Sequence, residues 1–68
     1  MNAIQLNITE NMRQLMKSRG ISQEQLAQAR GITQGAFSNK LSNKRPWNTD
    51  DITFYSAYFD MPVTSIIS

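Results

Sequence analysis

Residues 22–41, SQEQLAQARGITQGAFSNKL, contain the clearest structural signals of the chain. Ser22 is followed three residues later by Gln25, which is the pattern of a capping box and predicts that a helix begins here. Gly31 tolerates the left-handed backbone conformation that ends many helices, and Thr33 is a residue type that caps the start of the next one. The stretch therefore predicts two short helices joined by a tight turn, which is a helix-turn-helix motif.

The second helix of this motif, expected over about residues 34–42, has two unlike faces. Phe37 and Leu41 are one helical turn apart, and they predict a face that joins the core. The other side is polar but uncharged, which suits hydrogen bonding to base edges in the major groove of DNA. The residues on that side are Gln34, Gly35, Ser38 and Asn39.

The composition narrows the possible functions. A chain of 68 residues forms one domain with a small core, so a second copy that adds buried surface would stabilise it. Cysteine and histidine are both absent, which excludes disulfides, the usual zinc sites and Ser-His-Asp triads. We therefore expect no catalytic residue, metal, cofactor or small-molecule ligand. No signal peptide or membrane-spanning segment is visible, so the sequence predicts a soluble cytoplasmic protein without membrane contact.

The net charge is only +2, but the charges are unevenly distributed. All seven basic residues lie within residues 13–45, where Glu24 is the single acid, so this segment carries a net charge of +6. Residues 46–68 contain three aspartates and no basic residue. The basic segment includes the helix-turn-helix, which indicates attraction to phosphate groups.

Apolar periodicity and capping residues predict five helices and no strand. Asn7 or Thr9 is expected to cap the first helix, and Asn43 is expected to end the third in a left-handed conformation. Asn48 with Asp51 three residues later predicts the start of the fourth. The expected helices cover about residues 9–19, 23–30, 34–42, 49–59 and 62–67.

Several short sequence words follow one another in a set order. ISQ at 21–23 opens the first helix of the motif, and LA at 26–27 lies within it. GITQ at 31–34 forms the turn, FS at 37–38 lies in the second helix, and the basic NKRPW loop at 43–47 follows. In this order and spacing the chain resembles the lambda-repressor and Cro-like (Xre-type) helix-turn-helix regulators, and the proline-bounded loop is similar to that of their phage-repressor branch.

The resemblance implies an all-α, compact five-helix lambda-repressor-like domain over residues 1–68, with the helix-turn-helix at about 22–42. It implies a sequence-specific transcription regulator of double-stranded DNA, similar to a Cro protein or a compact phage repressor. It also implies a location in the bacterial cytoplasm or nucleoid, with a phage or plasmid as a possible source of the gene. Such a protein binds a two-fold operator as a homodimer, formed either in solution or only on the DNA. Candidate dimer contacts in the last two helices are Tyr58, Val63, Ile66 and Ile67.

The resemblance also indicates which residues contact DNA. Gln34 occupies a position that the family uses for DNA contact, where a long amide can pair with adenine. Gln23 matches a position that touches phosphate and can brace Gln34. Gly35 either permits close approach to DNA or is simply tolerated in the first helical turn. The full set of expected DNA-binding residues is Gln23, Thr33, Gln34, Gly35, Ser38, Asn39, Lys40, Ser42, Asn43, Lys44 and Arg45.

Two residues admit more than one interpretation. Arg30 stands where the family usually has leucine just before the turn glycine, so its guanidinium must snorkel to solvent, pair with an acid or face a phosphate. Trp47 could donate its indole N–H to a phosphate, although a tryptophan beside proline in a small domain more often packs in the core.

Other classes of function remain alternatives. An antitoxin-like or anti-repressor module would keep the fold and bind a protein, and a stable hetero-complex without operator affinity would reveal it. Enzymatic function is disfavoured because Asp50 and Asp51 are adjacent at a helix start, where their side chains diverge. RNA binding is disfavoured because the chain has no aromatic platform of the kind that RNA-binding modules use.

Overall fold

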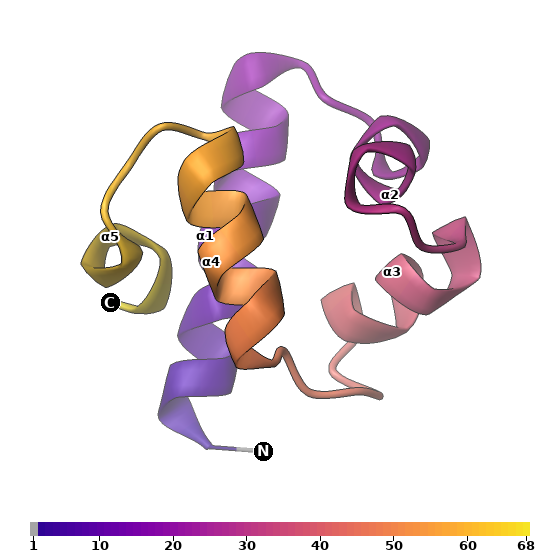
Figure 1. Ribbon diagram of the computed structural model, residues 1–68. Coiled ribbons are helices and arrows are strands. Elements are labelled where there is room, and N and C mark those ends of the chain that lie inside the picture. The colour runs from indigo at the N-terminus through magenta and orange to yellow at the C-terminus, as the bar shows by residue number, and fades with distance from the viewer. Residues whose placement is uncertain (1) are drawn as a thin grey trace.

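The computed structural model describes residues 2–68, and all regular structure in that range is helical, as predicted (Figure 1). The longest helix has 17 residues, and none of the helices in the described range is long and apolar enough to span a bilayer. The five helices are α1 (Ala3–Arg19), α2 (Gln23–Arg30), α3 (Gln34–Leu41), α4 (Thr49–Tyr58) and α5 (Val63–Ile67).

Helix α1 begins earlier than the sequence analysis predicted. Asn2 caps it, and the Asn2 side chain accepts a hydrogen bond from the backbone N–H of Gln5 at 2.9 Å. The prediction that Asn7 or Thr9 caps this helix is therefore wrong, because both residues lie inside it. Most of the additional residues are exposed, but Ile8 is completely enclosed in the core and Gln5 is hydrogen-bonded to Trp47, so tertiary contacts hold these turns at two points.

The helix-turn-helix forms as predicted. Ser22 and Gln25 make the reciprocal hydrogen bonds of a capping box at the start of α2. Gly31 ends α2 with a φ of 80°, in the left-handed region that glycine adopts without strain. Thr33 caps α3, because its hydroxyl oxygen accepts a hydrogen bond from the N–H of Ala36 at 3.0 Å. Local signals therefore determine both helices and the turn between them.

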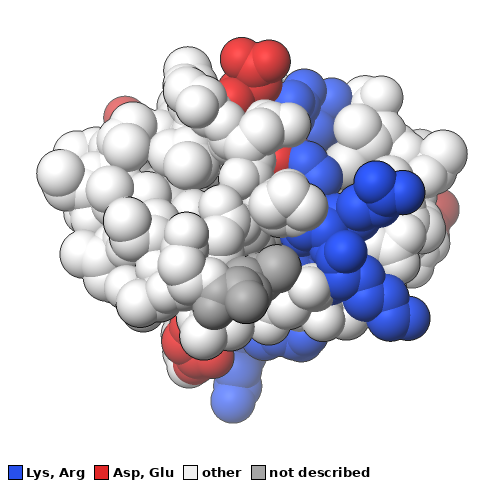
Figure 2. All heavy atoms as spheres, turned by 90° about the horizontal axis from the view of Figure 1, so that it is seen from below, with Lys and Arg blue, Asp and Glu red and all other residues white. Residues whose placement is uncertain are grey.

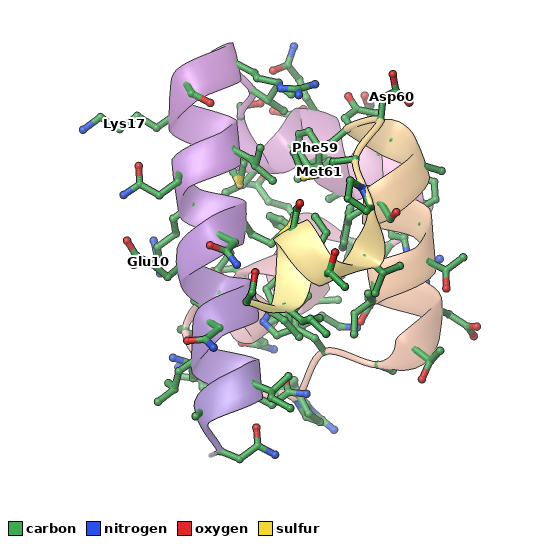
Figure 3. The ribbon with its side chains drawn as sticks, turned by 90° about the vertical axis from the view of Figure 1, so that its left-hand side faces the viewer. Glu10, Lys17, Phe59, Asp60 and Met61 are labelled. Carbon is green, nitrogen blue, oxygen red and sulfur yellow. The ribbon has the colours of Figure 1, made fainter. Side chains whose placement is uncertain are left out.

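The remaining helices form the body that carries this motif. Helix α1 packs against α5 and α3, while α4 packs against α5 and α2 packs against α3. Figure 3 shows α5 lying between α1 and α4. The side chain of Asn11 on α1 donates to the carbonyl oxygen of Ile66 at 2.7 Å, and Asn7 donates to that of Ile67 at 3.3 Å. These bonds satisfy carbonyl groups at the end of α5 that have no partner within the helix.

Three aromatic side chains join α3 and α4 at the centre of the core. The rings of Phe37 and Trp47 have centroids 6.0 Å apart, those of Phe37 and Tyr55 6.2 Å, and those of Trp47 and Tyr55 5.9 Å. All three pairs meet edge to face, a favourable geometry for aromatic rings. Trp47 is 3% exposed, so the prediction that it packs in the core is confirmed.

The connections on either side of α4 follow the sequence signals closely. Asn43 has a φ of 62°, which confirms the predicted left-handed residue after α3. Asn48 and Asp51 form the predicted cap at the start of α4, with hydrogen bonds in both directions. Helix α5 begins one residue later than expected, so Pro62 is its N-cap and not part of its first turn.

Replacing each of two glycines by alanine should change the free energy of unfolding in opposite directions. Gly31→Ala places a side chain at a φ of 80° and should lower the free energy of unfolding by about 1 kcal/mol. Gly35→Ala adds a Cβ with no atom within 4 Å and should raise it by up to about 1 kcal/mol, because alanine favours the helix. Urea unfolding of both variants measures the difference, and shifts of the same sign would contradict this account.

Candidate nucleic-acid interface

Helix α3 presents the polar face that the sequence predicts. Phe37 and Leu41 are buried, at 0% and 3% exposed. The residues on the opposite side are all exposed, and they are Gln34, Gly35, Ser38 and Asn39. Among residues 2–68, apart from the adjacent residues and the backbone of α3 itself, no atom lies within 4 Å of a Cβ built on Gly35, so tertiary packing does not require glycine there. This face is an open surface of hydrogen-bonding side chains with room for a close approach.

Other expected site residues lie around this face. Thr33 is exposed at the start of α3, and its oxygen is occupied by the cap described above, although its hydroxyl proton remains available. Gln23 is half-buried in the first turn of α2. Ser42 is exposed just after α3 and donates to the carbonyl oxygen of Asn39 at 3.3 Å.

The loop after α3 folds back onto the end of that helix. The backbone N–H groups of Lys44 and Arg45 both donate to the carbonyl oxygen of Asn39, at 2.9 and 3.1 Å. Asn43 makes this turn possible through its left-handed conformation and is itself half-buried. The Lys44 and Arg45 side chains are exposed, so two cations project beside the polar face of α3.

The basic side chains share one region of the surface. In Figure 2 they form a band across the face seen from below, and the left-hand end of that face, where α5 lies in Figure 1, shows none. Acidic side chains lie mainly outside the band (Figure 2). The uneven charge along the sequence therefore becomes an uneven charge in space.

Four of the seven basic residues are held by groups of the protein itself. Arg13 on α1 donates to the last carbonyl oxygen of α3 at 2.7 Å. Arg19 donates to the carbonyl oxygen of Phe59 at 3.1 Å, with its guanidinium 5.3 Å from the centroid of that ring. The other two are Arg30 and Lys40, which pair with an acid.

Within residues 2–68, the remaining basic side chains make no ion pair or hydrogen bond. Lys17 is one of them, and in Figure 3 it projects from α1 away from α4 and α5. The other two are Lys44 and Arg45, next to α3. The cations available to a phosphate beside the polar face are therefore those of the loop.

Arg30 and Lys40 both pair with the same acid, Asp51, which is only 1% exposed. One of its carboxylate oxygens accepts from Nε of Arg30 at 3.2 Å. The other accepts from the ammonium of Lys40 and from the backbone N–H of Asn48, the latter at 3.0 Å. One carboxylate thus binds the last residue of α2, a residue of α3 and the cap of its own helix. Of the three interpretations of Arg30, pairing with an acid is the one observed.

Tyr55 lies one helical turn after Asp51, and its hydroxyl is buried without a hydrogen-bond partner among residues 2–68. Burial raises the pKa of this hydroxyl above its ordinary value, and the negative charge of Asp51 raises the pKa further, against a lowering by Arg30. The hydroxyl therefore stays protonated at neutral pH, and it adds no charge to the cluster formed by Asp51, Arg30 and Lys40.

This cluster was not predicted from the sequence, where Asp51 was expected only in the cap of α4 and Lys40 only on the DNA-facing surface. The side chain of Lys40 is 15% exposed and its ammonium is bound to Asp51, so it lies on the inner side of α3. A usable signal was present, because Asp51 and Tyr55 are four residues apart on one face of α4, and a carboxylate on a core face requires a cationic partner.

The fold and the exposed face of α3 define a helix-turn-helix domain. A family model described as the Cro/C1-type HTH DNA-binding domain matches residues 11–67. The chain therefore belongs to the Cro/C1-type helix-turn-helix DNA-binding domains, which confirms the resemblance found in the sequence. This family consists of DNA-binding domains and is typically not enzymatic. No curated protein and no solved structure matches the chain.

Proposed function

We propose that the chain, as one domain over residues 1–68, is a sequence-specific transcription regulator that acts as a Cro-like or compact phage-type repressor. The observation that carries this proposal is the exposed, uncharged polar face of α3 beside the two unpaired cations of the following loop. An α-helix of this kind fits the major groove, where hydrogen-bonding side chains distinguish base pairs. Phosphate attraction by the loop supplies affinity that does not depend on sequence.

Each part of the surface has its own role in this proposal. Gln34 reads a base, with Gln23 bracing it or touching a phosphate, and Gly35 lets the start of α3 approach the groove. Lys40 supports α3 from its inner side through Asp51. The remaining contacts, to bases or to the sugar-phosphate strand, come from Thr33, Ser38, Asn39, Ser42, Asn43, Lys44 and Arg45.

The proposed target is a two-fold operator bound by a homodimer. Two copies of α3 about 34 Å apart would enter successive major grooves on one side of the duplex. Ile66 is fully buried, so its expected role as a dimer contact is wrong. Tyr58 and Val63 are each 42% exposed and are the better candidates.

Gln34→Ala tests base readout. It should weaken operator binding by about 1–3 kcal/mol and relax preference at one base pair per half-site, because paired hydrogen bonds to a base edge are lost. Fluorescence anisotropy with operator and random duplexes measures this. Gln14→Ala is the matched control, since the Gln14 amide binds Glu10 on α1 and no other side chain or backbone group of residues 2–68. Equal losses of affinity on both duplexes would show that Gln34 contacts a phosphate and not a base.

The same measurement on the wild-type protein tests the alternative function. A wild-type protein that binds no duplex but forms a stable complex with another protein would favour the protein-binding alternative.

Neutralising the loop tests the phosphate contacts. The double variant Lys44→Gln/Arg45→Gln should weaken binding to all duplexes alike and reduce the slope of log K against log salt by up to about 2, because two counterion-releasing contacts disappear. Lys17→Gln removes a cation that projects from the other end of the long helix and should leave the slope nearly unchanged. An unchanged slope in the double variant would show that the loop does not contact phosphate groups.

Val63→Asp tests the dimer. The side chain is half-exposed, so the fold should survive while a charge at the contact opposes pairing of two copies. Cooperative binding to a full operator should weaken more than binding to a half-site, which serves as the internal reference. Sedimentation of the wild-type protein on a full operator should give two subunits per duplex, whereas one subunit at saturation would contradict the dimer.

A further inference from the structure

The first turns of α1 touch the basic loop, although they are far from it in sequence. They precede residues 11–67, the part of the chain that matches the family. Figure 1 shows the N-terminal end of α1 near the segment that connects α3 to α4. Two residues of α1, Gln5 and Thr9, make the contacts, and their spacing of four places them on the same face of the helix.

Gln5 holds the end of the loop through both groups of its side-chain amide. Its Nε2 donates to the carbonyl oxygen of Trp47 at 2.9 Å, and its Oε1 accepts from the backbone N–H of Trp47 at 2.6 Å. One amide thus satisfies both backbone groups of one residue, as a neighbouring strand would. The pairing fixes the direction of the chain where the loop enters α4.

Thr9 connects the two ends of the loop. Its buried hydroxyl accepts from Nε1 of Trp47 at 2.9 Å and lies 2.7 Å from Oδ1 of Asn43. A hydroxyl donates only one proton, and the carbonyl oxygen of Gln5 is farther away at 3.2 Å, so the proton goes to Asn43. The indole, the hydroxyl and the Asn43 amide form a continuous chain of hydrogen bonds across the base of the loop.

The two residues of the loop that α1 holds, Asn43 and Trp47, lie on either side of the unpaired cations. Lys44 and Arg45 lie between Asn43 and Trp47, and their own N–H groups are bound to α3. The backbone from which they project is therefore held from α1 on one side and from α3 on the other. A loop that is already ordered does not lose conformational entropy when it meets a ligand, which strengthens binding.

We propose that Gln5 and Thr9 are positioning residues for phosphate binding, which order the loop so that Lys44 and Arg45 face the DNA backbone. The inference rests on the proposed function, because it takes these two cations as phosphate contacts. It assigns a role to turns of α1 that lie outside the matched family segment. The expected consequence is that removing contacts remote from DNA weakens binding to every duplex.

The test uses Gln5→Ala and Thr9→Val, with Thr9→Ser and Gln14→Ala as matched controls. Binding of a labelled random-sequence duplex is measured for variants whose helical circular dichroism shows them folded. Each of the first two should raise Kd about fivefold, as expected from the loss of one or two hydrogen bonds that order the loop. Thr9→Ser keeps the hydroxyl and should restore binding, and Gln14→Ala should bind as the wild type does. If Gln5→Ala does not fold, Gln5→Met replaces it, since it keeps the side-chain length without the amide.

A second measurement reports on the loop without DNA. Hydrogen exchange at the amides of Lys44 and Arg45, followed by NMR, should be faster in Gln5→Ala and Thr9→Val than in the controls. Unchanged exchange and unchanged Kd in the folded variants would overturn the inference while leaving the proposed function intact. A wild-type protein that binds no duplex would refute the proposed function, and the inference with it.

Discussion

The buried carboxylate of Asp51 fixes how the helix-turn-helix sits on the rest of the molecule. It binds Arg30 at the end of α2 and Lys40 within α3, and it belongs to the first turn of α4. Removing one partner of such a cluster leaves buried charge without compensation, which is costly, so the three side chains act as a unit. The orientation of α3, and with it the position of the candidate DNA contacts on that helix, depends on this unit and on the aromatic rings beside it.

The basic residues differ in what holds them. Arg13 joins α1 to the end of α3, and Arg19 joins α1 to the end of α4. Through Asp51, Lys40 joins α3 to α4 and Arg30 joins α2 to α4. Lys44 and Arg45 point outward and remain available to a phosphate. A net charge of +6 over the basic segment therefore overstates the charge that DNA would meet directly, because part of it stabilises the fold. In the proposed function, specificity would come from α3 and sequence-independent affinity from the loop after it.

Features that depend on nearby residues could be predicted from the sequence. The turn at Gly31 and the cap at Thr33 involve contacts within five residues, so residue type and spacing are sufficient. The start of α1 was misplaced because the turns after its cap, Asn2, are mostly exposed and are held by contacts distant in sequence, such as that of Gln5 with Trp47. The pairing of Gln5 with Trp47 could not be predicted, since it joins residues 42 positions apart whose types indicate no such contact. The Asp51 cluster likewise joins residues that are distant in sequence, and its one sequence signal is the carboxylate at a core-facing position.

A double-mutant cycle on the Asp51 cluster tests whether this unit holds the motif in place. Asp51→Asn is made in the wild-type chain and in the Arg30→Leu/Lys40→Leu background, and the free energy of unfolding in urea is measured for all four proteins. If the carboxylate acts through both cations, Asp51→Asn should cost about 3 kcal/mol in the wild-type chain and at least about 1 kcal/mol less in the background. Equal losses in the two backgrounds would show that Asp51 serves only as the cap of α4.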